Sequence, residues 1–325
     1  MSSNGRSLSQ RASVGDRALL ATLIAVWAVA WPVMKLGVAA LSPLWFGCLR
    51  YMIGATLFFV VLAIRRRIII PGRRDWRLIV ISGALQMAGY SALTGLALAL
   101  LPPGRASVLA YSTPLWVVPL GAWRLKEIPS KKEILGVVMG LAGVALIASP
   151  SFRAGRTDHL PAYIMLVGAA VLWAVSIVYV RGHEFAATPV ELAPWQMLVA
   201  FSILLPITIF AEGPIPNIVL SAVLSLAYVA PVATAFGYWA MVESGRHFRA
   251  NTISIALLAT PMGGISISAL LLGEVIDASL IGGAVLIGSG IVLAVGSEWV
   301  GRHHDAGLIE DVPAADVSAT SMTAR

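Results

Sequence analysis

Ten long apolar runs constrain this chain more strongly than any other feature of its sequence. About 20 apolar residues are needed for a helix to cross the hydrocarbon core of a bilayer. In lipid, a helix satisfies all of its backbone N–H and C=O groups within one segment. The sequence therefore predicts an all-α polytopic membrane protein with ten transmembrane helices. The runs lie at residues 18–38, 43–64, 78–100, 104–124, 133–149, 162–181, 189–211, 218–241, 250–272 and 278–298.

The composition of the chain is also that of an integral membrane protein. Of its 325 residues, 58% are hydrophobic and 12% are charged, whereas soluble domains are about 25% charged. The mean hydropathy is +0.85. The formal net charge is +7, but the basic residues gather at the ends of the apolar runs. They therefore indicate membrane orientation rather than nucleic-acid binding.

The distribution of Lys and Arg predicts which way the chain crosses the membrane. An even number of helices places both termini on one side. Loops and terminal segments on that side carry 18 Lys and Arg, against four on the opposite side. By the positive-inside rule both termini are cytoplasmic. Residues 1–17 are expected to be a cytoplasmic N-terminal segment without a cleavable signal, and residues 299–325 a disordered cytoplasmic tail.

Two halves of the chain repeat the same pattern. Thr113-Pro114 and Glu127 recur 147 residues later as Thr260-Pro261 and Glu274, and Trp27 recurs 146 residues later as Trp173. The sequence thus predicts a first five-helix unit at 18–149, a linker at 150–161 and a second unit at 162–298. Because five is odd, the units are inverted in the membrane, an arrangement typical of secondary transporters.

The repeated run of Pro, Glu and Gly carries a family resemblance. Pro114, Glu127, Gly136 and Gly143, with their counterparts 147 residues later, resemble the EamA unit of the drug/metabolite transporter superfamily. Among its members the chain most resembles the YddG-type aromatic amino-acid exporters. The resemblance implies a multi-pass protein of the bacterial inner membrane that moves a small molecule, as a monomer or a weak homodimer.

Several side chains are candidates for lining a substrate cavity. Gln86, Tyr90 and Thr94 step by four residues, which places them on one face of a helix. A buried Gln in lipid is expensive, so this face is expected to look into protein or water. Aromatic walls with a few hydroxyl groups suit a ligand that has a ring and a polar head. The other candidates are Trp27, Tyr111, Trp173, Tyr179 and Tyr238; packing in the core or at the membrane interface is the alternative for each.

Prolines and charged residues form a second group of candidates. Pro114 and Pro261 each lie about 10 residues into a span, so they are expected to act as hinges or to break a helix beside a cavity, or else to kink it harmlessly. Arg50 lies inside a span and is either functional or structural. Glu127 and Glu274 lie at helix ends and are expected to be structural or gating residues.

The residues and motifs that are absent from the spans also restrict the functions that the sequence allows. None of the 16 carboxylates and five histidines lies at mid-depth in a span, and no phosphate-binding loop is present. No metal-ligand cluster is expected, no cofactor is implied, and an enzyme is not favoured. We therefore interpret the chain as an exporter of aromatic and other apolar amino acids by alternating access, facilitative rather than proton-coupled. Broad drug or metabolite efflux is the alternative, and a membrane-embedded enzyme or lipid flippase is a third.

Overall fold

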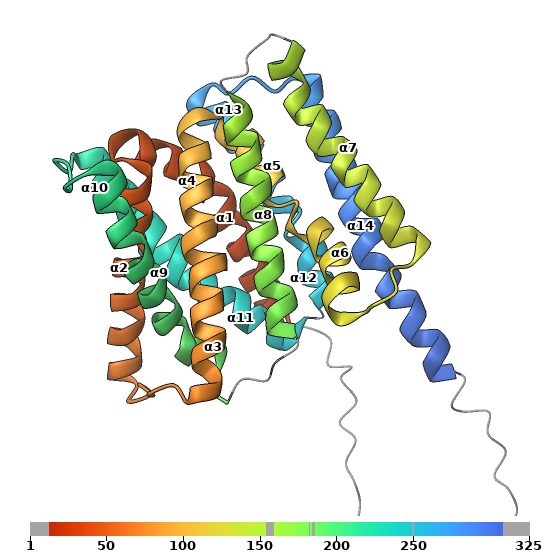
Figure 1. The fold of residues 1–325 in the computed structure, drawn as a ribbon, viewed down its shortest axis with the longest axis horizontal. Helices are drawn as coiled ribbons and strands as arrows, with labels where there is room; N and C mark the ends of the chain where they lie inside the picture. Colours follow the sequence, from red (N-terminus) through yellow and green to blue (C-terminus); the bar gives the residue numbers. More distant parts are fainter. Residues whose placement is uncertain (1–12, 154–158, 182, 184–185, 249, 308–325) are drawn as a thin grey trace, which may run out of the picture.

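A computed structural model describes residues 13–153, 159–181, 183, 186–248 and 250–307, and shows only helices, turns and loops within them. Figure 1 shows the helices as one bundle, with their axes mainly along one direction. The first half contains α1 (Val14–Ala40), α2 (Pro43–Ile64), α3 (Arg73–Ile81), the π-helix η1 (Ser82–Gly89), α4 (Tyr90–Leu100), α5 (Pro103–Ala110), α6 (Thr113–Leu125) and α7 (Lys131–Arg153). The second half contains α8 (Leu160–Arg181), α9 (Pro189–Glu212), α10 (Leu220–Tyr228), the π-helix η3 (Val229–Phe236), α11 (Gly237–His247), α12 (Ala250–Ala256), α13 (Ala259–Leu272) and α14 (Ala278–Gly307).

Nine helices among the described residues are long and apolar enough to cross a membrane. The chain is therefore a multi-pass membrane protein. Residues 104–124 differ from the single helix predicted for them, because the helix ends at Ala110 and begins again at Thr113. Neither α5 nor α6 alone has the length of about 20 residues that a crossing requires.

Helix boundaries recur along the chain at a spacing of 146 or 147 residues. Even the two π-helical segments fall 147 residues apart, at Ser82–Gly89 and Val229–Phe236. The interruption between α5 and α6 has its counterpart between α12 and α13. Pairs of first residues at this spacing are Val14 with Leu160, Pro43 with Pro189, Arg73 with Leu220, Pro103 with Ala250, Thr113 with Ala259, and Lys131 with Ala278.

The ends of the predicted segments need correction. Residues 14–17 already belong to α1, and residues 299–307 continue α14, where the sequence predicted a disordered tail. The linker predicted at 150–161 is shortened by the last turn of α7 and the first residues of α8. The remaining parts of the predicted terminal segments, residues 1–12 and 308–325, lie outside the described residues, as do residues 154–158 of the linker.

Helices α7 and α14 form a pair along one edge of the bundle (Figure 1). A Cβ atom added at Gly143 would lie 2.7 Å from the carbonyl oxygen of Gly283, and one added at Gly136 would collide with the carbonyl oxygen of Gly290. Small residues let membrane helices approach this closely. Since Gly136 and Gly283 are counterparts, as are Gly143 and Gly290, the contact is reciprocal.

We expect Gly143→Ala to destabilise the protein by about 1–3 kcal/mol, because the new methyl group meets backbone atoms that have no room to move. The matched control is Gly288→Ala on α14, where an added Cβ meets nothing within 4 Å. That change should be neutral or stabilising by up to about 1 kcal/mol, since Ala favours helix more than Gly. Thermal unfolding of the detergent-purified variants measures both. Equal melting temperatures would contradict the close α7–α14 contact.

The two halves of the chain interlock in the rest of the bundle. Helix α1 of the first half packs against α13 of the second, and α8 of the second packs against α6 of the first. Helices α2 and α9 also pack together. Large apolar side chains remain exposed on the outside, including Phe210 at 94% and Leu270 at 84%. In a membrane these surfaces face lipid, so their exposure carries no hydrophobic penalty.

Candidate functional site

A cavity of about 450 Å³ lies between the two halves of the chain. Its walls come from α6, α8, α11, α12 and α14, and from the loop that joins α6 to the start of α7. Three charged residues line it, Glu127 and Arg181 at helix ends and Glu133 in the first turn of α7, and its remaining walls are largely apolar. At the spacing described above, the counterparts of α8, α11 and α12 are α1, α4 and α5, and Lys35 of α1, the end of α4 and the start of α5 lie near Glu274 at the opposite end of the bundle. We call these two ends of the molecule the Glu127 end and the Glu274 end.

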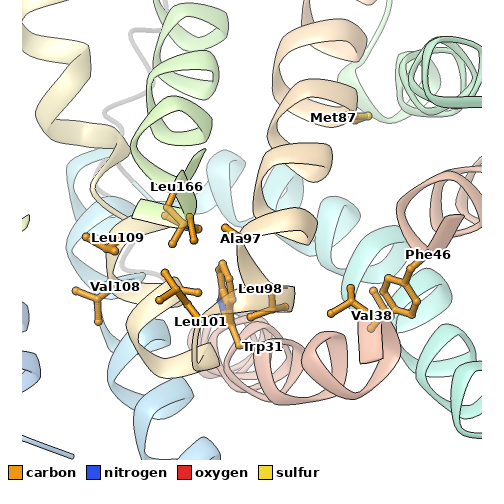
Figure 2. Close-up of a cluster of buried hydrophobic side chains, with 14 of the residues drawn as sticks. Trp31, Val38, Phe46, Met87, Ala97, Leu98, Leu101, Val108, Leu109 and Leu166 are labelled. Atoms are coloured by element: carbon orange, nitrogen blue, oxygen red, sulfur yellow. The ribbon is translucent and has the colours of Figure 1, made fainter. Parts of the chain in front are cut away.

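The Glu274 end is closed by an apolar cluster. Figure 2 shows Trp31 of α1 beside Ala97, Leu98 and Leu101, which lie at the end of α4. Trp31 is 4% exposed and Leu101 is 2% exposed. The ring of Trp31 also contacts that of Tyr111, with 6.4 Å between the ring centroids. Among the described residues, α1, α4 and α5 are therefore packed together at this cluster.

Lys35 fixes the connection between α4 and α5. Its Nζ donates to the carbonyl oxygens of Leu98 at 2.7 Å, Ala99 at 3.1 Å and Leu101 at 3.3 Å. The last carbonyl groups of a helix have no partner within the helix, and a positive charge there is favourable. The ammonium group of α1 therefore holds the end of α4 in place.

Glu274 fixes the same connection from the other side. Its carboxylate accepts hydrogen bonds from the N–H groups of Gly104 at 2.8 Å and Arg105 at 3.2 Å, at the first turn of α5. Burial raises the pKa of the Glu274 carboxyl group, while these two N–H groups and the nearby positive charges act to lower it. Arg105 adds an ion pair to Asp277, so the segment after α13 is bound to α5 at two points.

Arg50 lies half-buried within α2. Its Nε donates to the hydroxyl of Thr234 at 2.6 Å, and its Nη1 lies 3.5 Å from the sulfur of Met34. The guanidinium carbon lies 5.3 Å from the centre of the Tyr51 ring. A guanidinium has five N–H donors, so Arg50 retains donors beyond the two that are bonded to the described residues.

Two aromatic rings and two polar side chains join η1 and α4 to α8. The rings of Tyr90 and Trp173 meet edge to face, with centroids 4.9 Å apart. The hydroxyl of Ser176 donates to Gln86 at 3.4 Å. Tyr90 also lies within electrostatic range of Arg50. The structure therefore brings three of the predicted cavity residues, Gln86, Tyr90 and Trp173, to one region where the halves meet.

The hydroxyl of Thr94 is hydrogen-bonded within its own helix. Its side chain is buried at 6% exposure and bonds back to the carbonyl oxygen of Tyr90 at 2.7 Å. Ser82–Gly89 is a π-helix, whose wider turn changes the position of Gln86 relative to Tyr90, whereas Tyr90 and Thr94 keep α-helical spacing within α4.

The other predicted cavity residues lie elsewhere. Trp27 donates to the carbonyl oxygen of Ala233 at 3.0 Å, and the hydroxyl of Tyr238 bonds Gln196 at 3.1 Å. The ring of Tyr179 stacks on His183 near the end of α8. Tyr111 lines a separate cavity of about 500 Å³ bordered by α5, α13 and α14. These four side chains thus have separate contacts.

The prolines begin helices. Pro114 is the second residue of α6, and Pro261 is the third residue of α13. Proline fits the first turn of a helix because that turn has no partner for its N–H groups. The breaks therefore lie two to four residues earlier than the prolines, at Tyr111–Ser112 and Leu257–Leu258. Pro114 lines the cavity at the Glu127 end, and Pro261 lines the one near Tyr111.

Sequence reasoning missed Lys35, Thr234 and Gln196 as site residues. Lys35 had a signal, since it is one of only four basic residues on its side of the predicted topology and matches Arg181 at the repeat spacing. Gln196 matches Arg50 at the same spacing. Thr234 had no signal, because a single Thr in an apolar run is common. Within the described residues, no group of three or more His, Cys, Asp or Glu could hold a metal ion.

These features define a class of protein. A bundle of membrane-crossing helices with a cavity between two interlocking halves is the architecture of a membrane transporter. The sequence matches the EamA-like transporter family twice, over residues 17–149 and over residues 160–296. The chain belongs to this family, which is part of the drug/metabolite transporter superfamily.

Relatives include proteins named for amino-acid export. The chain is 25% identical to a probable amino-acid metabolite efflux pump of Salmonella typhimurium, over 86% of this chain and 94% of that protein. It is 31% identical to the aromatic amino acid exporter YddG of Ancylobacter novellus, over 37% of this chain and 41% of that protein. A solved crystal structure resembles it with a TM-score of 0.59 at 24% identity, covering 90% of this chain and 99% of that one, a likeness of fold alone.

Proposed function

We propose that this protein exports aromatic and other apolar amino acids from the cytoplasm by alternating access, without an obligatory coupling ion. The observation that carries the proposal is the position of Arg50. It is a half-buried cation among apolar helices, and it retains N–H donors beyond those bonded to the described residues. A substrate carboxylate is the partner that such a guanidinium favours most, because the two form charge-assisted and often bidentate hydrogen bonds. The nearby rings of Tyr90 and Trp173 provide a surface for an aromatic or apolar side chain.

We infer that the chain crosses the membrane ten times as two inverted five-helix repeats. The recurring helix boundaries and the two separate family matches support this arrangement. So does the reciprocal contact of Gly136 with Gly290 and of Gly143 with Gly283, since a two-fold axis between α7 and α14 would exchange the two contacts. In this topology α5 with α6, and α12 with α13, each make one interrupted crossing.

The orientation follows from the same topology. Arg65, Arg66 and Arg67 follow α2, and Arg73, Arg74 and Arg77 lie in the first turns of α3. The positive-inside rule places these residues, and with them the Glu127 end and both termini, in the cytoplasm. In a bacterial inner membrane, the cavity beside Glu127 and Arg181 would then open to the cytoplasm, where an exporter collects its substrate.

The relatives' names support the substrate class. The Salmonella protein is named as an amino-acid metabolite efflux pump and the Ancylobacter protein as an aromatic amino acid exporter. Both names are consistent with a site built from a cation and aromatic rings. Broad drug or metabolite efflux is the second candidate, because the cavity at the Glu127 end has largely apolar walls.

Proteoliposomes test the proposed substrate class. Vesicles containing the purified protein are loaded with radiolabelled tryptophan, phenylalanine, leucine, glutamate, glucose or a cationic dye, and efflux is followed. The proposal expects the first three to leave at least about tenfold faster than from protein-free vesicles. Efflux of the dye alone would favour the second candidate and contradict the first.

We expect transport to be insensitive to the proton gradient. No Asp, Glu or His lies at mid-depth in any predicted span, and a proton-coupled carrier needs a titratable group in its pathway. Tryptophan efflux from proteoliposomes should change less than about twofold when an uncoupler collapses an imposed pH difference. Loss of transport on addition of the uncoupler would show that a coupling group has been overlooked.

A further inference from the structure

We propose that Glu127 and Arg181 form a lock that closes the Glu127 end of the pathway, and that it alternates with the lock made by Glu274 and Lys35 at the other end. The inference rests on the proposed alternating access and adds the residues that hold each end shut. It assigns the present structure to the state that is open at the Glu127 end.

The lock at the Glu274 end is fully formed. Lys35 binds three carbonyl oxygens at the end of α4, and Glu274 binds two N–H groups at the start of α5. The two charges thus hold one helix connection from both sides. The Lys35 cation binds the carbonyl groups before it, and the Glu274 anion binds the N–H groups after it. Lys35 comes from the first half of the chain and Glu274 from the second, so the clamp joins the halves.

The same pair of charges exists at the opposite end. Arg181 follows Lys35 by 146 residues, and Glu127 precedes Glu274 by 147 residues. Arg181 ends α8, the counterpart of α1, and Glu127 follows α6, the counterpart of α13. Again one charge comes from each half. The helix ends they would clamp are the last turn of α11 and the first turn of α12, the counterparts of the last turn of α4 and the first turn of α5.

The second pair is not engaged. Glu127 and Arg181 are both exposed, and neither has a hydrogen bond or ion pair with another described residue. Yet both line the same cavity as Gly245 and Phe248, which belong to the end of α11 and the residue after it. The two charges and the end of α11 therefore border the same cavity without contact.

Counterpart residues along the pathway show the same asymmetry. At the Glu127 end, Ile177, Phe248 and Ser254 line the cavity. Their counterparts at the Glu274 end are Trp31, Leu101 and Ser107, which are buried at 4%, 2% and 0% exposure. One end is open and the other closed, although both are built from equivalent positions.

Exchange of the two locks follows from this pairing. As the Glu127 end closes, Arg181 reaches the carbonyl groups that end α11 and Glu127 reaches the start of α12. Lys35 and Glu274 then release the connection between α4 and α5, and Ser107 becomes accessible. In each state one pair of charges is bonded and the other is hydrated. The two states therefore have similar numbers of charge-assisted hydrogen bonds. Neither is strongly favoured by them, so the two can interconvert.

Cysteine labelling tests the exchange without any substrate. In a Cys48→Ala background, S107C reports access from the Glu274 end and S254C access from the Glu127 end. Each is labelled with a membrane-impermeant thiol reagent, in right-side-out and inside-out vesicles. When all four lock residues are unchanged, S254C should react readily and S107C slowly. The proposal expects Lys35→Met or Glu274→Gln to raise S107C labelling about tenfold and to lower that of S254C.

The decisive variants combine changes at both ends. Adding Arg181→Met or Glu127→Gln to Lys35→Met should return S107C labelling most of the way to its starting rate, because both states have then lost a clamp. The matched control is Arg77→Met, an exposed arginine in the second turn of α3, which should change neither rate. The inference is overturned if Lys35→Met leaves S107C unreactive. It is equally overturned if both second changes leave the effect of Lys35→Met intact.

The same variants separate this inference from the proposed function. If the labelling rates respond as expected but no amino acid is transported, the lock stands and the substrate assignment fails. If amino acids are exported while the labelling rates stay fixed, the lock fails and the substrate assignment stands.

Discussion

Replacing Arg50 with Gln is expected to lower the efflux of phenylalanine from proteoliposomes by roughly a hundredfold. In the proposed site, Arg50 binds the substrate carboxylate while Thr234 holds its Nε at 2.6 Å. Removing one partner of a buried, hydrogen-bonded charge pair costs about 2–5 kcal/mol, and 1.4 kcal/mol is a factor of ten. Arg50→Lys should lose less, about tenfold, because it keeps the charge but not the fork of donors.

Arg77→Gln is the matched control, because Arg77 is exposed in the second turn of α3. It should export phenylalanine at the wild-type rate. Gel filtration and melting temperature of Arg50→Gln distinguish loss of the site from loss of the fold. A well-folded Arg50→Gln variant with wild-type efflux would show that Arg50 is a structural residue bound to Thr234 and Met34.

Truncating the aromatic and polar side chains of η1 and α4 is expected to have the second largest effect. Tyr90→Ala removes a ring that meets Trp173 at 4.9 Å, and Gln86→Ala leaves Ser176 without one of its partners. A buried polar group that loses its partner costs about 1–3 kcal/mol. Each variant should therefore export aromatic amino acids about ten- to a hundredfold more slowly.

Tyr90→Phe separates the ring from its hydroxyl, and it should retain most of the rate if the ring forms the substrate surface. Val60→Ala serves as the control, because Val60 is 48% exposed on the outer face of α2. Wild-type efflux by both Tyr90→Ala and Gln86→Ala would exclude this region from the pathway.

Local sequence features were enough to predict much of the fold. Long apolar runs indicate helices whatever their neighbours, so most helices lie where hydropathy placed them. Pro43 and Pro189 begin α2 and α9 because proline suits the first turn of a helix. The π-helical segments were not predictable in this way, since a π-helix is set by packing around it and has no residue signature.

The site was predictable only in part, because its contacts join distant residues. Arg50 stood out as the single charge inside a span, but its partner Thr234 lies 184 residues away. Glu274 was recognised as a residue at a helix end, whereas its bonds to the first turn of α5 span 169 and 170 residues. Tyr238 and Trp27 were grouped by residue type, and the structure gives them separate partners.

Counterflow tests most directly whether this protein is an alternating-access exporter of aromatic amino acids. Proteoliposomes are loaded with unlabelled phenylalanine and diluted into a trace of labelled tryptophan. A carrier with one exchanging site returns loaded with tryptophan after releasing phenylalanine, so the label should rise transiently above its equilibrium level. The overshoot should be absent from vesicles that contain Arg50→Gln. Entry of label that never exceeds the level in unloaded vesicles would contradict the account.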